Sequence, residues 1–348
     1  MGLTLDYSQV KEVYAQAAER GVAIPTFCAE DRETLEAILA AAYELGQEIG
    51  VPNLPVAPAW TCRYPGRKQM TLVTQCADPY LGMEMMHSDL QLFAGEHSPY
   101  RNLTIVPHLD HAFPWHDMDV LLQYADRFAS VMCDASERPF EENIEITAKY
   151  VEQVKGKVLV EGGVDEVFEA TGDKHKNEAT TVEQARRFLS ETGVDIIVPN
   201  VGTEHRATAD KVKYNSRRAR EISREVGKIM CLHGTSSVPK EDLSTLPQDG
   251  FVKINIFTIL AVKGGQSVAD VVLRNLGNIF TSDQLERYVA DGILSKNVLS
   301  PDYAQAFGGI KPRLNSAANP MRRRAWFTIV KDTCKEYMRT FNYENYAR

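Results

Sequence analysis

The stretch LTIVPHLDHAFPWHDMDVLLQYADRFASVMCDAS, residues 103–136, contains the pattern on which the fold prediction rests. An apolar run at 103–109 is followed by an amphipathic segment at 115–124 and by a second apolar run at 129–134. Neither run alternates clearly between apolar and polar residues, which is typical of strands buried on both faces of a parallel sheet. We therefore interpret this stretch as a strand, a helix and a second strand.

The same alternation continues along most of the chain. We expect strands at residues 22–27, 103–109, 129–134, 158–161, 195–199, 229–233 and 251–256, with an eighth near 50–57, where prolines obscure the pattern. We expect helices at residues 31–46, 78–93, 115–124, 140–154, 181–192, 209–226, 258–276 and 322–341. Eight such units predict an α/β protein, a single (β/α)8 TIM barrel with a C-terminal helical extension. One domain would span 1–348, with the C-terminal helical segment at about 277–348.

A doubly wound open sheet is the main alternative fold. Such a sheet requires a glycine-rich phosphate loop after its first strand. The first run here is followed by Cys28-Ala29-Glu30-Asp31, which contains no glycine. The sequence therefore favours the closed barrel. Residues 58–78 and 277–320 are longer than a barrel needs, and long loops on a barrel often carry function.

Composition narrows the functional classes. Of 348 residues, 44% are hydrophobic and 25% are charged, as in ordinary soluble domains. The 39 Lys and Arg against 47 Asp and Glu give a net charge of −8, which offers no basic field for nucleic acid. No apolar run approaches the ~18 residues of a membrane span, and the first residues do not resemble a secretory signal. Six cysteines without a CxxC pair suit buried thiols in a reducing compartment. We expect a cytoplasmic protein without nucleic-acid or membrane partners.

Histidines gather at the ends of three expected strands. His108 and His111 end one run, His205 follows another, and His233 ends a third, although the chain has only 8 histidines. A single histidine at a strand end is more often a hydrogen-bonded structural residue, but three ends of one barrel are harder to explain so. Three imidazoles bind Zn²⁺ with a position left open for substrate. Asp110, beside His111, is then placed to act as a general base.

The last two expected strands end in hydrogen-bond donors. Gly234, Thr235 and Ser236 follow one of them, and Asn255 and Thr258 lie at the end of the other. Backbone N–H groups at the helix starts after the last two strands are the usual phosphate site of a barrel. Ordinary helix capping by Ser236 and Thr258 is the alternative. We favour phosphate binding because both loops carry such donors.

These motifs, in this order, resemble the class II (zinc-dependent) fructose-bisphosphate aldolase family. The likeness covers most of the chain. The matching segments are GVAIPTF at 21–27, HLDH at 108–111, VMCDAS at 131–136, PFEENI at 139–144, GTEH at 202–205, LHG at 232–234 and KINI at 253–256. Each motif is short, and it is their order at strand ends that indicates the family.

The resemblance implies an active site built on a metal. His111, His205 and His233 would bind Zn²⁺ or another divalent metal, and Asp110 would be the base or acid near the reacting carbon. The metal would bind the ketone and hydroxyl oxygens of a ketose and stabilise the enediolate left by C–C cleavage. No lysine Schiff base is then required, and Lys157 and Lys253, the natural candidates for one, are more simply structural.

A second proton-transfer residue and the substrate contacts are less sharply defined. Glu166, Glu169 and Asp173 are candidates for the second acid, and we take Glu169 as the working assignment. The residues expected at the substrate and its phosphate are Gly202, Arg206, Gly234, Thr235, Ser236, Asn255 and Thr258. The resemblance also allows a monovalent cation beside the phosphate.

The sequence departs from the family pattern around the substrate. Arg206 replaces the glycine after the G-T-x-H histidine, and HGTSS at 233–237 lacks two glycines of H-G-G-S-G. Phe257 replaces the aspartate of N-x-D-T, Gly163 replaces a carboxylate that can serve the metal, and Cys28 replaces an asparagine. We therefore expect retained metal chemistry in an altered pocket, in which Arg206 binds an anion and fructose 1,6-bisphosphate is a poor substrate.

Three functions remain open at this point. The first is a metal-dependent aldolase acting on a ketose phosphate or related sugar derivative. The second is a metal-dependent sugar epimerase or isomerase of the same fold, because enediolate formation needs the same metal and base. The third is a non-catalytic aldolase-like subunit. The resemblance implies a homodimer or homotetramer in each case.

Overall fold

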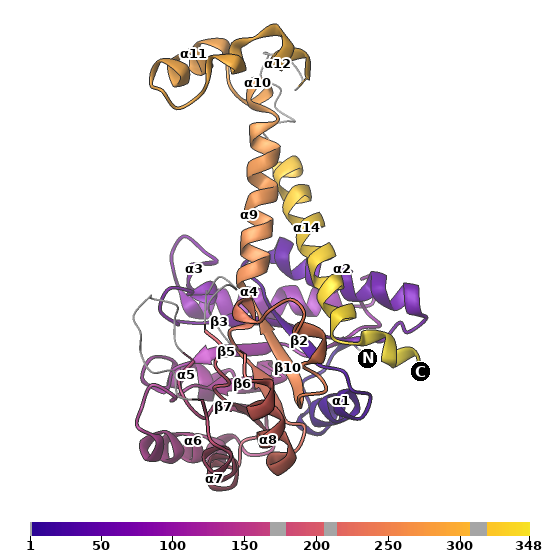
Figure 1. Ribbon diagram of the computed structural model, residues 1–348, viewed down its shortest axis with the longest axis vertical. Helices are drawn as coiled ribbons and strands as arrows, with labels where there is room; N and C mark the ends of the chain where they lie inside the picture. The colour runs from indigo at the N-terminus through magenta and orange to yellow at the C-terminus, as the bar shows by residue number, and fades with distance from the viewer. Residues whose placement is uncertain (1, 168–178, 205–213, 307–318) are drawn as a thin grey trace.

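The computed structural model describes residues 2–167, 179–204, 214–306 and 319–348. Within these residues, eight parallel strands close into a barrel with helices packed around it (Figure 1). The barrel strands are β2 (Ile24–Cys28), β3 (Pro55–Thr61), β5 (His108–Ala112), β6 (Ser130–Cys133), β7 (Leu159–Gly163), β8 (Ile196–Val198), β9 (Met230–Leu232) and β10 (Phe251–Ile256). Each strand pairs with the next along the chain, and β10 pairs with β2 to close the ring. The predicted TIM barrel is thus confirmed.

Two short strands and a set of helices complete the described structure. The strands β1 (Gly2–Leu3) and β4 (Thr104–Ile105) extend the sheet beside β3. The helices are α1 (Tyr7–Glu19), α2 (Arg32–Ile49), α3 (Gln69–Leu72), α4 (Pro79–Ala94), α5 (Pro114–Gln123), α6 (Phe140–Val154), α7 (Val182–Thr192), α8 (Ser216–Val226), α9 (Thr258–Leu273), α10 (Leu276–Ile279), α11 (Ser282–Ala290), α12 (Pro301–Ala306) and α14 (Asn319–Thr340). Short 3₁₀ turns include η2 (Thr235–Ser237) and η5 (Tyr343–Ala347).

Local sequence signals set the helix ends. Asp31 caps α2 by accepting a hydrogen bond from the Thr34 backbone N–H at 2.8 Å, and Gly50 ends that helix in the left-handed conformation. Thr181 and Gln184 form a reciprocal capping box at the start of α7. These caps fix the residues at which α2 begins and ends and at which α7 begins. They therefore set the length of helix that connects one barrel strand to the next.

Three expected boundaries were wrong. The eighth strand lies at Pro55–Thr61 rather than near 50–57. The run 103–109 divides into β4 and β5 at Pro107, which has no N–H to donate to a ladder. The helix expected at 209–226 begins at Ser216, and residues 205–213 lie outside the described part of the chain.

The helices α9 and α14 form an arm that stands out from the barrel (Figure 1). The two helices run side by side in opposite directions, and α10, α11 and α12 lie at the far end. At the base, α14 packs on α2, where Lys331 and Lys335 pair with Glu44 at 2.5 and 2.9 Å. The Trp326 indole donates a hydrogen bond to the Thr34 hydroxyl at 2.9 Å. These contacts fasten the last described helix to one of the first.

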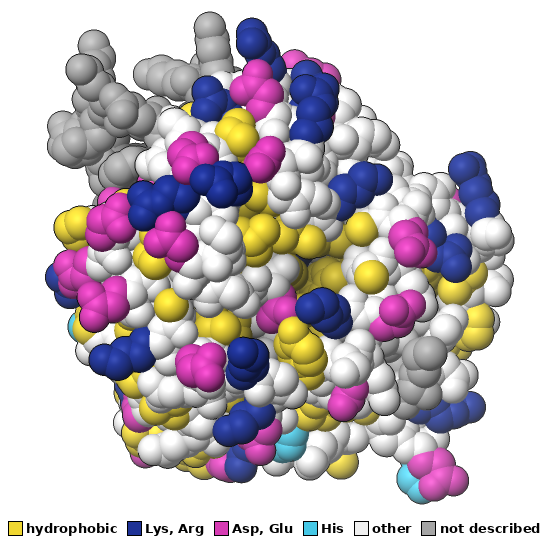
Figure 2. All heavy atoms as spheres, turned by 90° about the horizontal axis from the view of Figure 1, so that it is seen from below, with side chains coloured by type: hydrophobic (Ala, Val, Ile, Leu, Met, Phe, Trp, Pro, Cys, Tyr) yellow, Lys and Arg dark blue, Asp and Glu magenta, His cyan; other side chains and the backbone are white. Residues whose placement is uncertain are grey.

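The outer surface carries charges of both signs. Figure 2 shows basic and acidic side chains intermixed over the face seen from below, around a hollow with apolar walls. Among the described residues, no helix combines the length and the apolar character needed to cross a membrane.

The contact between α9 and α14 generates a stability prediction. A Cβ atom at Gly264 would lie 2.7 Å from ring carbons of Trp326, whereas one at the neighbouring Gly265 would meet nothing within 4 Å. We expect Gly264→Ala to lower the free energy of unfolding by about 1–3 kcal/mol through overpacking. The matched control Gly265→Ala should raise the free energy of unfolding by up to about 1 kcal/mol, because alanine has a higher helix propensity than glycine. Chemical denaturation of both variants measures the difference, and equal effects would contradict this packing.

Candidate active site

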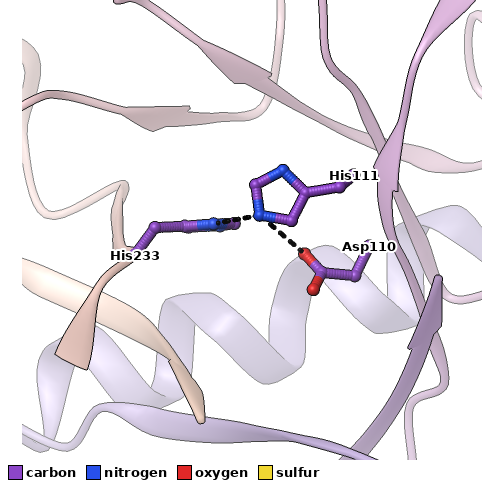
Figure 3. A group of neighbouring side chains, drawn as sticks. All are labelled: Asp110, His111 and His233. Atoms are coloured by element: carbon purple, nitrogen blue, oxygen red, sulfur yellow. Dashed lines mark hydrogen bonds and ion pairs between the residues drawn. The ribbon is translucent and has the colours of Figure 1, made fainter. Parts of the chain in front are cut away.

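Polar side chains converge where the carboxyl ends of the strands meet. Asp110 and His111 belong to β5, His233 directly follows β9, and Asn255 belongs to β10. Asp110, His111 and His233 are all buried, and each offers a possible ligand atom, all within 4.8 Å of one another (Figure 3). The barrel rim therefore brings two of the three expected metal histidines and the expected base to one point.

The two imidazoles face each other with their other nitrogens bonded to carboxylates. The Nε2 atom of His111 lies 3.0 Å from Nδ1 of His233. Nδ1 of His111 is 2.7 Å from Asp134, and Nε2 of His233 is 3.1 Å from Glu161. Each carboxylate is placed to accept a hydrogen bond from the nitrogen it contacts, and the two facing nitrogens would both be free to bind a metal when the two rings are neutral.

This arrangement fits a shared metal ion. A tetrahedral ion with bonds of ~2.0–2.1 Å separates two nitrogens by ~3.3 Å, close to the observed 3.0 Å. Imidazoles whose remote nitrogens donate to carboxylates are the usual ligands in metal sites. Asp110 offers a third possible ligand atom, an oxygen that lies 4.0 Å from Nε2 of His111. The donor set is thus appropriate for a divalent metal.

The backbone at His111 departs from a regular strand. His111 has a φ of 45°, and the register of β5 against β6 shifts between Leu109 and Ala112. In a regular strand, consecutive side chains point to opposite faces. The irregularity lets both Asp110 and His111 face the site. A non-glycine residue in this region costs roughly 1–3 kcal/mol, and such strain is concentrated at functional sites.

Asp110 is held as a carboxylate. One oxygen accepts a hydrogen bond from the Asn255 amide at 2.8 Å, and the other pairs with the guanidinium of Arg67. Burial would raise the pKa of Asp110, but the nearby charges of His111 and Arg67 outweigh it and hold the pKa well below its usual value. Asp110 is therefore ionised at neutral pH.

A buried ion pair lies beneath the site. Lys253 donates to Glu161 at 2.7 Å, and neither side chain is exposed. Burial would raise the pKa of Glu161, yet Lys253 and His108 lower it, so Glu161 stays ionised. Burial would lower the pKa of Lys253, yet Cys231 and Glu161 raise it. An ammonium held in this way is not a Schiff-base nucleophile, which agrees with a structural role for Lys253.

A pocket opens beside Asp110. It is lined by Cys28, Tyr64, Arg67, Asp110, His111, His233, Gly234, Thr235, Ser236, Asn255, Ile256, Phe257, Thr258, Ile259 and Tyr337. Five of the seven expected substrate residues are in this lining; Gly202 is not, and Arg206 lies outside the described residues. Gly234 has a φ of 72°, and a Cβ there would lie 2.9 Å from the Glu204 backbone. Only glycine fits that close approach.

Several expected site residues cannot be placed. His205, Glu169 and Asp173 lie outside the described residues, as Arg206 does. Glu166 is described and lies in a second pocket, on the side of His111 that also contains Asp134.

Sequence reasoning missed three residues that support the site. Asp134 ends an expected strand and lies in a quoted family motif, so its position was a signal that could have been used. Glu161 is at the end of another expected strand, but its contact with His233 comes from a different part of the chain. Arg67 lies in the long 58–78 segment, where no local pattern indicates that it enters the site.

The family model described as "Fructose-bisphosphate aldolase class-II" matches residues 8–345. A fructose-bisphosphate aldolase of Staphylococcus epidermidis is 26% identical over 271 residues, which cover 76% of this chain and 85% of that protein.

Solved structures share the fold. The YdjI aldolase of Escherichia coli K12 has a TM-score of 0.62 at 20% identity and covers 100% of both chains. The fructose-bisphosphate aldolase of Campylobacter jejuni has a TM-score of 0.72 at 17% identity, covering 98% of this chain and 95% of that one. At these identities the likeness shows the barrel fold alone.

The support of His111 by Asp134 gives a prediction on metal affinity. Asp134→Asn should weaken Zn²⁺ binding by ~10–100-fold, because it removes the carboxylate that orients the ring and makes it basic. Competition with a chromogenic chelator measures this affinity. Asp249→Asn is the control, since Asp249 is equally buried but pairs with Arg220 and Tyr214 away from the site. If the two variants bind Zn²⁺ equally well, Asp134 does not support the metal.

Proposed function

The chain belongs to the class-II fructose-bisphosphate aldolase family, and on that premise we propose that it is a metal-dependent aldolase for a ketose phosphate or related sugar derivative other than fructose 1,6-bisphosphate. One observation carries this proposal. Two imidazoles, each bonded to its own carboxylate, direct their remaining nitrogens at each other beside an ionised aspartate. That arrangement is appropriate for a metal centre with a base at its side.

The proposed metal ligands are His111, His233 and His205, although His205 is not among the described residues. A divalent ion held there, Zn²⁺ in our assignment, supplies Lewis-acid polarisation of the substrate's oxygens. Asp134 and Glu161 fix the orientation of the two described rings. Gly163 provides no carboxylate to the metal. A Cβ atom at this position would lie 3.0 Å from Ser136, because Ser136 and Asp134 fill the space beside it.

The proposed role of Asp110 is proton transfer at the reacting carbon or its hydroxyl. Its lowered pKa keeps it ionised, so it accepts a proton as the C–C bond breaks and returns it in the reverse direction. Asn255 and Arg67 each bond to a different oxygen of Asp110, which fixes the orientation of the carboxylate. A base that is already oriented needs little reorganisation during the reaction.

The proposed phosphate site lies on the other wall of the pocket. Gly234, Thr235 and Ser236 form the turn after β9, and Thr258 opens the long helix α9. Backbone N–H groups at these points favour an anion. A monovalent cation beside this phosphate, and contacts from Gly202 and Arg206, complete the proposal; Arg206 is not described. Phe257 brings apolar bulk to the same pocket, which supports a substrate different from fructose 1,6-bisphosphate.

Asp110→Ala should separate proton transfer from metal binding. We expect turnover to fall by ~10²–10⁴, the usual contribution of a general acid–base residue, while bound metal stays near one ion per chain. Steady-state kinetics and metal analysis on the same preparation provide the two readouts. Unchanged turnover would contradict the assignment of the base, and lost metal would mean that Asp110 is itself a ligand.

The substrate proposal is tested by a panel of reactions. With Zn²⁺ supplied, the enzyme should cleave fructose 1,6-bisphosphate poorly and should condense dihydroxyacetone or its phosphate with at least one other aldehyde. Product analysis distinguishes a new C–C bond from inversion at one carbon, which would indicate an epimerase. Rapid cleavage of fructose 1,6-bisphosphate would contradict the altered pocket. Bound metal with no reaction of either kind would favour a non-catalytic subunit.

A further inference from the structure

Arg67 is a buried cation in the pocket that the proposed mechanism uses only to hold Asp110. It lies in the loop between β3 and α3, and its side chain is only 10% exposed. Arginine is seldom buried unless it is paired, because an unpaired charge out of water is costly. The partners of Arg67 therefore indicate what the side chain is for.

The guanidinium is held between aromatic rings and has one charged partner. Its central carbon lies 4.6 Å from the ring centroid of Phe257 and 5.7 Å from that of Tyr64. One terminal nitrogen pairs with Asp110, and the other is 3.3 Å from the sulfur of Cys28. The rings fix the plane of the guanidinium without occupying its N–H groups.

The hydrogen-bonding capacity of Arg67 is not filled. Its Nε atom is buried and has no hydrogen-bond partner among the described residues. Asp110 contacts the guanidinium through one oxygen, and its other oxygen accepts from Asn255. The thiol of Cys28 is a weak acceptor, and burial raises its pKa to about 12, so it brings no charge. A buried donor without a partner is costly, which makes a missing acceptor the natural explanation.

Two departures from the family pattern contact this one side chain. By the resemblance described above, Cys28 takes the place of an asparagine and Phe257 that of an aspartate. Both touch Arg67, one through sulfur and the other through its ring. An aspartate at position 257 would offer Arg67 a second carboxylate, whereas phenylalanine contacts the guanidinium and accepts no hydrogen bond from its Nε–H group. Both departures therefore affect the surroundings of the Arg67 guanidinium.

We propose that Arg67 is a specificity-determining residue that binds an oxyanion carried by the substrate, a phosphate or a carboxylate. The planar fork of arginine matches both groups and binds them through two parallel hydrogen bonds. The inference rests on the proposed function for the identity of the pocket as the substrate site. It adds that the substrate carries an anionic group which reaches the β3–α3 loop.

The test measures binding of simple anions, without turnover. Inorganic phosphate and glycolate are titrated into the metal-loaded protein by calorimetry, and the two probes distinguish phosphate from carboxylate recognition. Arg67→Met should weaken the preferred anion by about tenfold or more, the usual effect of removing a charged hydrogen bond. Arg67→Lys, which keeps the charge but loses the fork, should give an intermediate loss.

Arg63→Met is the matched control. Arg63 lies in the same loop and also pairs with buried aspartate, but its partners are Asp117 and Asp119 and it does not line the pocket. This variant should bind the anion as the unaltered protein does. Equal weakening by both substitutions would overturn the proposal, and so would binding of neither probe to the unaltered protein.

A second pair of variants leaves Arg67 in place. Phe257→Asp should weaken anion binding by about tenfold, because the new carboxylate occupies the guanidinium. Phe257→Leu, which removes the ring but adds no charge, should have a smaller effect. If Phe257→Asp and Phe257→Leu weaken anion binding equally, the new carboxylate does not compete with the anion for Arg67. Because anion binding needs no reaction, these results stand even if no aldolase activity is found, and activity with unchanged anion binding would contradict this inference alone.

Discussion

The ion pair between Glu161 and Lys253 organises the site from inside the barrel. The two groups are 2.7 Å apart and fully enclosed, on strands β7 and β10. Burying both charges is expensive, and the cost is offset only when their remaining hydrogen-bonding capacity is used. Here Glu161 also contacts His233, and Lys253 also donates to the Asn255 side chain at 2.9 Å. The pair therefore sets the orientation of a proposed metal ligand and of the amide that holds Asp110.

The site divides into a part fixed by strands and a part formed by connecting segments. His111, Asp110 and Asn255 belong to barrel strands, so their relative positions follow from the closed sheet. Arg67, Phe257 and the turn η2 lie in connections at the rim. Connections tolerate change that strands do not. Phe257 lies in such a connection, whereas Cys28 ends strand β2, and both side chains contact the guanidinium of Arg67.

Much of the barrel and part of the site could be predicted from the sequence. Apolar runs that end in histidine place His111 and His233 at one rim as soon as a barrel is assumed, because parallel strands share their carboxyl edge. We placed one strand too early because of Pro55 and Pro58. Proline is usually confined to edge strands, strand starts or bulges, yet Pro58 lies inside β3. The carboxylate partners could not be paired in advance: Glu161 and Lys253 are 92 residues apart, and nothing local to either indicates the other. The stacking of Phe257 on Arg67 depends in the same way on a loop whose path has no periodic pattern.

The seam of the barrel has a consequence for biosynthesis. β2 is complete early in the chain, but its second neighbour, β10, follows more than two hundred residues later. Contacts at the base of the arm span even more, as in the bond between Asn342 and the Gly21 carbonyl across 321 residues. At roughly 5–20 residues per second, the ribosome takes on the order of ten to fifty seconds to synthesise the residues between β2 and β10. During that time the free edge of β2 and the apolar face of α2 lie uncovered on the nascent chain. Until β10 and α14 have been made, one edge of β2 and the face of α2 that packs on α14 lack their native partners.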